Sequence, residues 1–167
     1  MILGMTIQTF TLLHVVISLV AIGTGLIVVW HMLNGRQNDG WTAVFLFTTV
    51  LTSVTGFMFP VPLSPLLPSQ IFGFISLAVL LPTLLALCVY KLVGVWRWVY
   101  VGGALLALYL NVFVLVAQAF LKISFLQPLA PTQAEMPFLV AQLVVFVLFC
   151  ALGAIAAMRF KPEAVEA

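Results

Sequence analysis

Charge is what this sequence has least of. Six lysines and arginines and four aspartates and glutamates are its only charged residues, which is 6% of a chain of 167. A soluble domain has about a quarter of its residues charged. So few charges cannot cover a globule in water, and they also exclude a disordered chain and an ordinary nucleic-acid-binding protein.

Cysteines and catalytic signatures are scarce as well. The two cysteines, Cys88 and Cys150, lie inside apolar runs and have neither the spacing of a disulfide framework nor that of a metal site. The sequence contains no HExxH, no GxSxG and no phosphate-binding glycine loop. No carboxylate lies within the long apolar stretches, which argues against a pump driven by protons or sodium. These absences favour a protein that is not an enzyme.

Long apolar runs are what the sequence has in abundance. Hydrophobic residues make up 65% of the chain, and the mean hydropathy is +1.30. About 20 helical residues cross the roughly 30 Å hydrocarbon core of a bilayer, and continuous apolar runs indicate helices, whereas barrel strands alternate. We therefore predict an all-α polytopic membrane protein, a bundle of five transmembrane helices forming one domain over residues 1–167. The predicted helices cover residues 6–31, 41–59, 69–90, 98–121 and 137–158.

The basic residues predict an orientation for this bundle. With five spans, one side of the membrane receives only Lys122, and the other side receives Arg36, Lys91, Arg97, Arg159 and Lys161. The positive-inside rule then places the N-terminus outside and the C-terminus in the cytoplasm. The four tryptophans agree, because aromatic rings with a polar edge prefer the membrane interface, and all four fall at the predicted inner ends of the helices: Trp30, Trp41, Trp96 and Trp98.

Prolines predict two local features. The segment 59–68 contains four prolines and no charge, so we expect a stiff, partly extended cap on the outer side. Pro82 lies in the middle of the third span, where its ring removes a backbone hydrogen bond and predicts a kink.

Polar side chains inside the spans are the candidate functional residues, because each of them needs a partner in lipid. His14 lies about 12 Å below the outer end of the first span at 1.5 Å per residue. Polar side chains of the second, fourth and fifth spans also fall in the outer half of the bundle or point toward it. If their faces turn inward, they line a pocket open to the outside, with these candidate ligand-binding residues: His14, Thr52, Thr55, Asn111, Gln118 and Gln142.

Each of these residues also has a plainer interpretation. Serine and threonine hydroxyls let transmembrane helices pack closely, and they can return their hydrogen bonds to the preceding turn of backbone. His14 can complete a structural hydrogen-bond network, bind a quinone or haem, or relay a proton. A haem would need His14 paired with Met58, or with His14 of a second copy. His31 cannot serve, since it lies roughly 25 Å further along the same helix.

Three runs carry a resemblance to known sequences: TTVLTSVTGFMFP (48–60), VWRWVY (95–100) and LAPTQAE (129–135). They resemble small uncharacterised integral membrane proteins of the bacterial inner membrane. The resemblance extends over most of the chain and implies a location in the bacterial cytoplasmic membrane, and it implies no reaction.

Three functions remain open from the sequence. The first is binding of a lipid-soluble ligand or cofactor, quinone or haem, in the outer-leaflet polar pocket. The second is an accessory or assembly subunit of a larger membrane complex, and the third is a channel or facilitator for a small neutral solute. The expected partners are the lipid bilayer and a membrane protein or a second copy of the chain, and no nucleic acid is expected.

Overall fold

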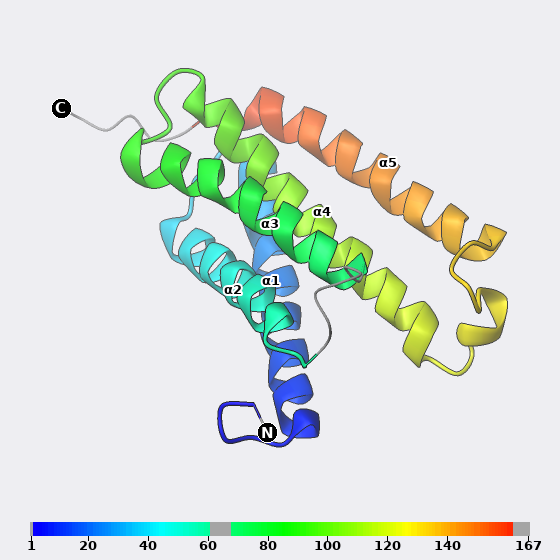
Figure 1. Ribbon diagram of the computed structural model, residues 1–167. Helices are drawn as coiled ribbons and strands as arrows, with labels where there is room; N and C mark the ends of the chain where they lie inside the picture. The colour runs from blue at the N-terminus through cyan, green and yellow to red at the C-terminus, as the bar shows by residue number, and fades with distance from the viewer. Residues whose placement is uncertain (1, 61–67, 162–167) are drawn as a thin grey trace.

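The computed structural model describes residues 2–60 and 68–161, and in this part of the chain helices joined by short loops account for the regular structure, apart from one isolated β-bridge between Ile2 and Met5 (Figure 1). Two short helices accompany the long ones: the π-helix η1 (Leu85–Val89) extends the third, and the 3-10 helix η2 (Gln127–Leu129) lies in the last loop. The long helices are α1 (Ile7–Leu33), α2 (Asp39–Phe57), α3 (Pro68–Leu84), α4 (Trp96–Lys122) and α5 (Met136–Arg159).

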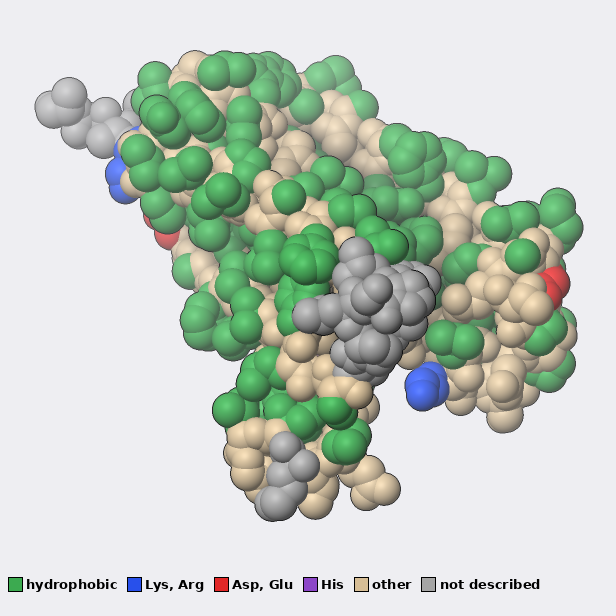
Figure 2. All heavy atoms as spheres, in the orientation of Figure 1, with side chains coloured by type: hydrophobic (Ala, Val, Ile, Leu, Met, Phe, Trp, Pro, Cys, Tyr) green, Lys and Arg blue, Asp and Glu red, His purple; other side chains and the backbone are tan. Residues whose placement is uncertain are grey.

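All five long helices are able to cross a membrane by length and composition. Their most apolar windows have mean hydropathies from 1.4 to 2.7, with η1 counted as part of the third span. Figure 2 shows hydrophobic side chains along the visible face, with the few charged ones near two opposite ends. Within the described residues, the prediction of an all-α chain with five helices of membrane-spanning length is therefore confirmed.

Local hydrogen bonds set where these helices begin and how they end. The Thr6 hydroxyl accepts from the backbone N–H of Thr9 at 3.2 Å and caps α1. Helix α2 starts two residues before the predicted position 41, because Asn38 Oδ1 accepts from the N–H of Trp41 at 3.1 Å. Helix α3 continues past Pro82 and then changes to the π-helix η1, a wider turn of the kind that accompanies irregularities in a helical ladder.

Helix α4 forms the middle of the bundle, since it contacts each of the other four long helices (Figure 1). Tyr100 and Leu108 of α4 are almost fully buried, together with Phe45 of α2, Met32 of α1 and Leu80 of α3. A smaller cluster of Phe120, Ala130 and Phe138 seals the loop between α4 and α5. The main core is thus contributed largely by α1 to α4.

Two glycines allow the helices to approach one another closely. A Cβ atom at Gly25 would lie 2.6 Å from Leu108 Cδ1 and 2.8 Å from the ring of Phe45, so α1 meets both α2 and α4 there. A Cβ atom at Gly103 would overlap the hydroxyl of Thr83. The α4 backbone at Gly103 therefore lies directly against the Thr83 side chain of α3. Small residues at such crossings are the usual basis of helix packing in membranes.

The helix ends gather at two ends of the bundle. We call one the basic end, defined by Arg36, Lys91, Arg97, Arg159 and Lys161. There Arg97 donates to the carbonyl oxygen of Phe160 at 3.3 Å, and Arg159 donates to that of Leu33 at 3.4 Å, which joins the end of α1, the start of α4 and the end of α5. We call the other the acidic-loop end, which holds the start of α1 and the α4–α5 loop with Glu135. Most of the proline-rich cap predicted over 59–68 lies outside the described residues.

Candidate functional site

His14 of α1 contacts α2 through a hydrogen bond between side chains. Its Nδ1 atom lies 2.8 Å from the hydroxyl oxygen of Thr55. That hydroxyl also lies 2.6 Å from the carbonyl oxygen of Leu51, one turn earlier on α2. A carbonyl oxygen only accepts, so the single hydroxyl proton of Thr55 goes to Leu51. Thr55 must therefore accept its second hydrogen bond from Nδ1–H of His14.

This arrangement fixes the tautomer of the neutral imidazole. With the proton on Nδ1, the Nε2 atom carries a lone pair and can only accept a hydrogen bond or bind a metal. No described residue donates a hydrogen bond to Nε2 of His14, and this atom is not among the fully buried polar atoms that lack a partner, so it is accessible at the surface of the helix pair. The structure therefore holds the ring by one nitrogen and leaves the other available.

One aromatic ring contacts this histidine, and a second ring packs against the first. Phe59 meets the imidazole edge to face, with centroids 5.4 Å apart and planes at 90°. Phe10, which is fully buried, packs against Phe59 at 5.1 Å. On the α2 side Gly56 lies against the ring, and a Cβ atom there would be 3.8 Å from Cε1 of His14, an ordinary van der Waals contact. The imidazole consequently sits in an apolar, aromatic setting.

One unpaired hydroxyl lies near this contact. The oxygen of Thr52 is buried and has no hydrogen-bond partner among the described residues. It lies three residues deeper than Thr55 on the same side of α2, because residues three apart share a helix face. By contrast, the neighbouring hydroxyls of Thr48, Thr49 and Thr55 each donate to a carbonyl oxygen one turn back, at 2.6–2.8 Å.

The remaining candidates join other pairs of helices. Asn111 of α4 donates to the Thr49 hydroxyl at 3.3 Å, about 9 Å deeper along α2 than Thr55. Gln142 of α5 donates to the carbonyl oxygen of Phe113 on α4 at 3.1 Å, and its own carbonyl oxygen is buried without a partner among the described residues. Gln118 is exposed on α4. The structure thus brings His14, Thr55 and Thr52 to one place and puts Asn111, Gln118 and Gln142 elsewhere.

The possible haem ligands are placed as follows. His31 lies at the basic end, where its Nδ1 is 2.9 Å from the carbonyl oxygen of Ile27 in its own helix. Met58 ends α2 three residues after Thr55, so it leaves the helix on the same side as Thr55. The described residues contain no group of three or more histidine, cysteine, aspartate or glutamate side chains that could hold a metal ion.

The sequence contains a signal for part of the aromatic frame, which its polar residues alone do not reveal. Phe10 precedes His14 by four residues on α1, and this spacing puts its ring on the face of His14, whereas Phe59 lies two residues past the end of α2 and is not placed by helix spacing. No comparable signal distinguishes the unpaired hydroxyl of Thr52 from the paired hydroxyls beside it. That difference arises only when the helices pack.

Comparison of the chain with protein-family models, with curated proteins and with solved structures finds no match. Function therefore has to be inferred from the chemistry around His14.

Proposed function

We propose that this protein binds a small lipid-soluble ligand where α1 meets α2, and that Nε2 of His14 is the atom that recognises it. The hydrogen bond from His14 to Thr55 carries this proposal, because the proton of Thr55 is committed to Leu51 and the Nε2 lone pair is left over. A polar atom without a partner is costly in an apolar setting. A ligand that donates to this lone pair, or coordinates through it, removes that cost.

The free lone pair selects among ligands. A quinone carbonyl only accepts hydrogen bonds and does not match Nε2 in this tautomer, whereas the hydroxyl of the reduced quinol donates and matches it. Haem iron also binds an imidazole lone pair. A second axial ligand would come from Met58 on the same side of α2, or from His14 of a second copy. The ring of Phe59, which packs against the buried ring of Phe10, offers either planar ligand an apolar wall.

The other polar contacts support this choice by elimination. Asn111 donates to the Thr49 hydroxyl, and Gln142 donates to the Phe113 carbonyl oxygen. Both hydrogen bonds join two helices and are of the kind that stabilises helix packing. We place the basic end in the cytoplasm and the N-terminus outside, following the positive-inside rule. His14 then lies in the outer leaflet of a bacterial cytoplasmic membrane, within reach of lipid-soluble ligands.

The test is an absorption spectrum of protein purified gently from its native membrane, air-oxidised and then reduced with dithionite. A solvent extract of the same sample is analysed for quinones. We expect either a Soret band that shifts on reduction or a quinol bound in a fixed ratio to the protein. Both must be lost in His14→Ala.

His31→Ala is the matched control, since His31 also donates from Nδ1 to an oxygen of the protein but lies at the basic end. This variant should keep the ligand. A wild-type protein that carries neither chromophore nor quinol when prepared in the presence of native lipid would overturn the proposal. Equal loss of ligand in both variants would do so too, because the ligand would then depend on folding and not on Nε2 of His14.

A further inference from the structure

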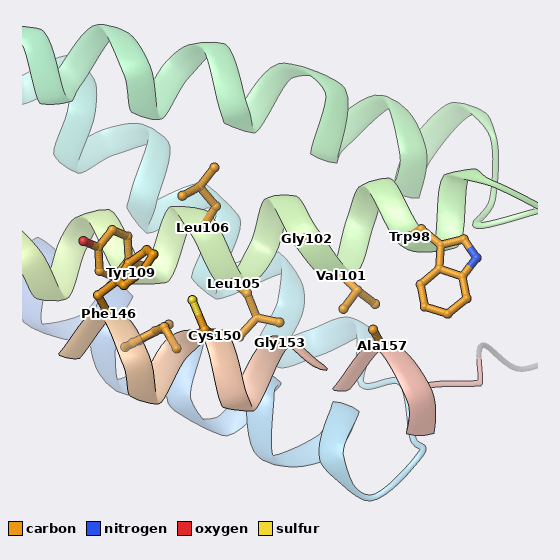
Figure 3. Close-up of a pocket in the computed structure, with 11 residues that line it drawn as sticks. Trp98, Val101, Gly102, Leu105, Leu106, Tyr109, Phe146, Cys150, Gly153 and Ala157 are labelled. Atoms are coloured by element: carbon orange, nitrogen blue, oxygen red, sulfur yellow. The ribbon is translucent and has the colours of Figure 1, made fainter. Parts of the chain in front are cut away.

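A second site of a different kind lies between α4 and α5. A cavity of about 300 Å³ runs along these two helices, and its walls are apolar (Figure 3). Figure 3 shows Trp98 at one end of this groove and Tyr109 with Phe146 at the other. Gly102 and Gly153 lie along its length and leave it open. A Cβ atom at Gly102 would meet nothing within 4 Å.

The length of the groove matches one leaflet of a bilayer. From Trp98 to Tyr109 the α4 helix rises about 16 Å, at 1.5 Å per residue. Half of a hydrocarbon core of about 30 Å is about 15 Å. Trp98 belongs to a residue type that prefers the membrane interface, and its side chain is 47% exposed. The groove therefore spans the depth of one acyl chain, from the interface toward the middle of the membrane.

A basic side chain, Arg97, covers the interfacial end of the groove. The guanidinium carbon of Arg97 lies 4.3 Å from the centroid of the Trp98 ring, directly over the groove's end residue. Arg97 also donates to the carbonyl oxygen of Phe160, and Lys161 follows Phe160 in the chain. Arg159 and Lys161 line a second cavity beside the end of α1. Arg97 is therefore the basic side chain that lies over the end of the groove, while Arg159 and Lys161 lie in the neighbouring cavity next to α1.

These charges are not neutralised by their hydrogen-bond partners. Both guanidinium groups donate to backbone carbonyl oxygens, which carry no formal charge. Asp39, the acid of this end that lies within the described residues, accepts from the side-chain amide of Gln37 at 2.6 Å. An anion is the complementary partner for such a cluster.

We propose that this groove binds one anionic phospholipid, with an acyl chain between α4 and α5 and the phosphate at Arg97. The proposal rests on an apolar groove that is as long as one acyl chain and that ends beneath the guanidinium group of Arg97. It is independent of the ligand at His14, which lies on a different pair of helices. Basic pockets between transmembrane helices at the membrane interface are suited to anionic headgroups.

The test uses native mass spectrometry of the full-length protein in mixed micelles. The micelles hold phosphatidylglycerol and phosphatidylcholine in equal amounts and with the same acyl chains. We expect wild-type protein to retain one phosphatidylglycerol in preference to phosphatidylcholine. Excess inorganic phosphate should not displace it, because the acyl chain contributes to binding. Equal retention of the two lipids, or displacement by phosphate, would overturn the proposal.

Two variants test the groove and the charges separately. Gly102→Leu fills the groove from an open position and should abolish retention of the lipid, and leucine favours the helix more than glycine. Gly23→Leu is its matched control, since a Cβ atom at Gly23 of α1 also meets nothing within 4 Å, and it should bind as wild type. Arg97→Gln should lower the preference for phosphatidylglycerol about fivefold, the usual effect of one basic residue at an anionic surface.

A wild-type preference in Arg97→Gln together with wild-type retention in Gly102→Leu would contradict the assignment. So would an equal loss of lipid in Gly23→Leu, which would show a general effect of enlarging glycines. Lys122→Gln at the acidic-loop end controls for net charge and should leave the preference unchanged. Circular dichroism of each variant confirms that the helices are intact.

Discussion

The acceptor of its one hydroxyl proton determines which further hydrogen bonds a threonine side chain in this protein can make. Thr55 has one hydroxyl proton, and the Leu51 carbonyl receives it, so the hydroxyl becomes an acceptor for His14. Thr52 carries the same group three residues away and has no partner among the described residues. Two identical side chains on one helix face therefore have different chemical roles. The position of α1 accounts for the acceptor role of Thr55, because it places the ring of His14 beside that hydroxyl.

Glu135 gives a prediction about pH at the residue scale. One of its carboxylate oxygens accepts from the hydroxyl and the N–H of Thr132, at 2.7 and 3.2 Å, and the other accepts from the N–H of Ala134 at 3.1 Å. These bonds, led by that from the Thr132 hydroxyl, hold the pKa of Glu135 below its ordinary value of 4.5. A lowered pKa means that the carboxylate stabilises this loop above pH 4.5. The contribution is lost as the pH falls through the lowered pKa.

The measurement is a pH titration of the Glu135 side-chain carboxyl by carbon NMR in micelles. We expect a midpoint below 4.5 in wild type and a higher midpoint in Thr132→Ala, which removes the leading hydrogen bond. Ser124→Ala, in the same loop, is the control and should leave the midpoint where it is. A wild-type midpoint at or above 4.5 would refute the geometry of this loop.

At the scale of helices, close crossings make a prediction about stability. Gly25→Leu places a side chain where even a Cβ atom would lie 2.6 Å from Leu108 and 2.8 Å from Phe45. Overpacking of this kind typically costs about 1–3 kcal/mol, and we expect a lower temperature of thermal unfolding in micelles. Gly23→Leu, two residues earlier and facing open space, should unfold near the wild-type temperature. If both variants unfold alike, the crossing of α1 with α2 and α4 is wrong.

The helices could be predicted from the sequence because the signals for them are local. Apolar length and flanking charge are read within one segment, and the predicted bounds lie within two residues of the structure at both ends of every helix. The cap at Asn38 accounts for one of these small differences. The sequence predicts a kink at Pro82 but not the π-helix η1 that follows. Either a kink or a wider turn can accommodate the backbone hydrogen bond that Pro82 cannot donate.

The candidate site was predictable only in part, because it depends on which helices pack together. Thr49 and Asn111 are 62 positions apart in the sequence, and nothing in either segment indicates that they meet. The common pocket expected for His14, Asn111 and Gln142 assumed that their helix faces converge. The structure instead gives each of these side chains a separate interface, α1–α2, α2–α4 and α4–α5.

The whole molecule yields a prediction about orientation. The proposed topology puts Arg36 in the cytoplasm and Lys122 outside, on the positive-inside rule. In a background with Cys88 and Cys150 replaced by alanine, Lys122→Cys should react with a membrane-impermeant maleimide added to spheroplasts. Arg36→Cys should react only after the membrane is permeabilised. The reverse pattern would invert the topology and move His14 to the inner leaflet.

Helix α5 differs from the others in how little of it is buried. In the apolar 18-residue stretch of α5, 17% of the residues are buried, against 33% in the corresponding stretches of α1 and α4. Among its described residues, Phe149 and Ala156 are the buried ones that belong to the main core. It is also the last of the five helices to leave the ribosome. The contacts of α1 with α2 and of α3 with α4 can form while α5 is still being synthesised, and α5 then docks on a completed surface. Until it arrives, the wall of α4 that later lines the groove faces the lipids of the inserting membrane, so the first lipid to reach it can be taken up during synthesis.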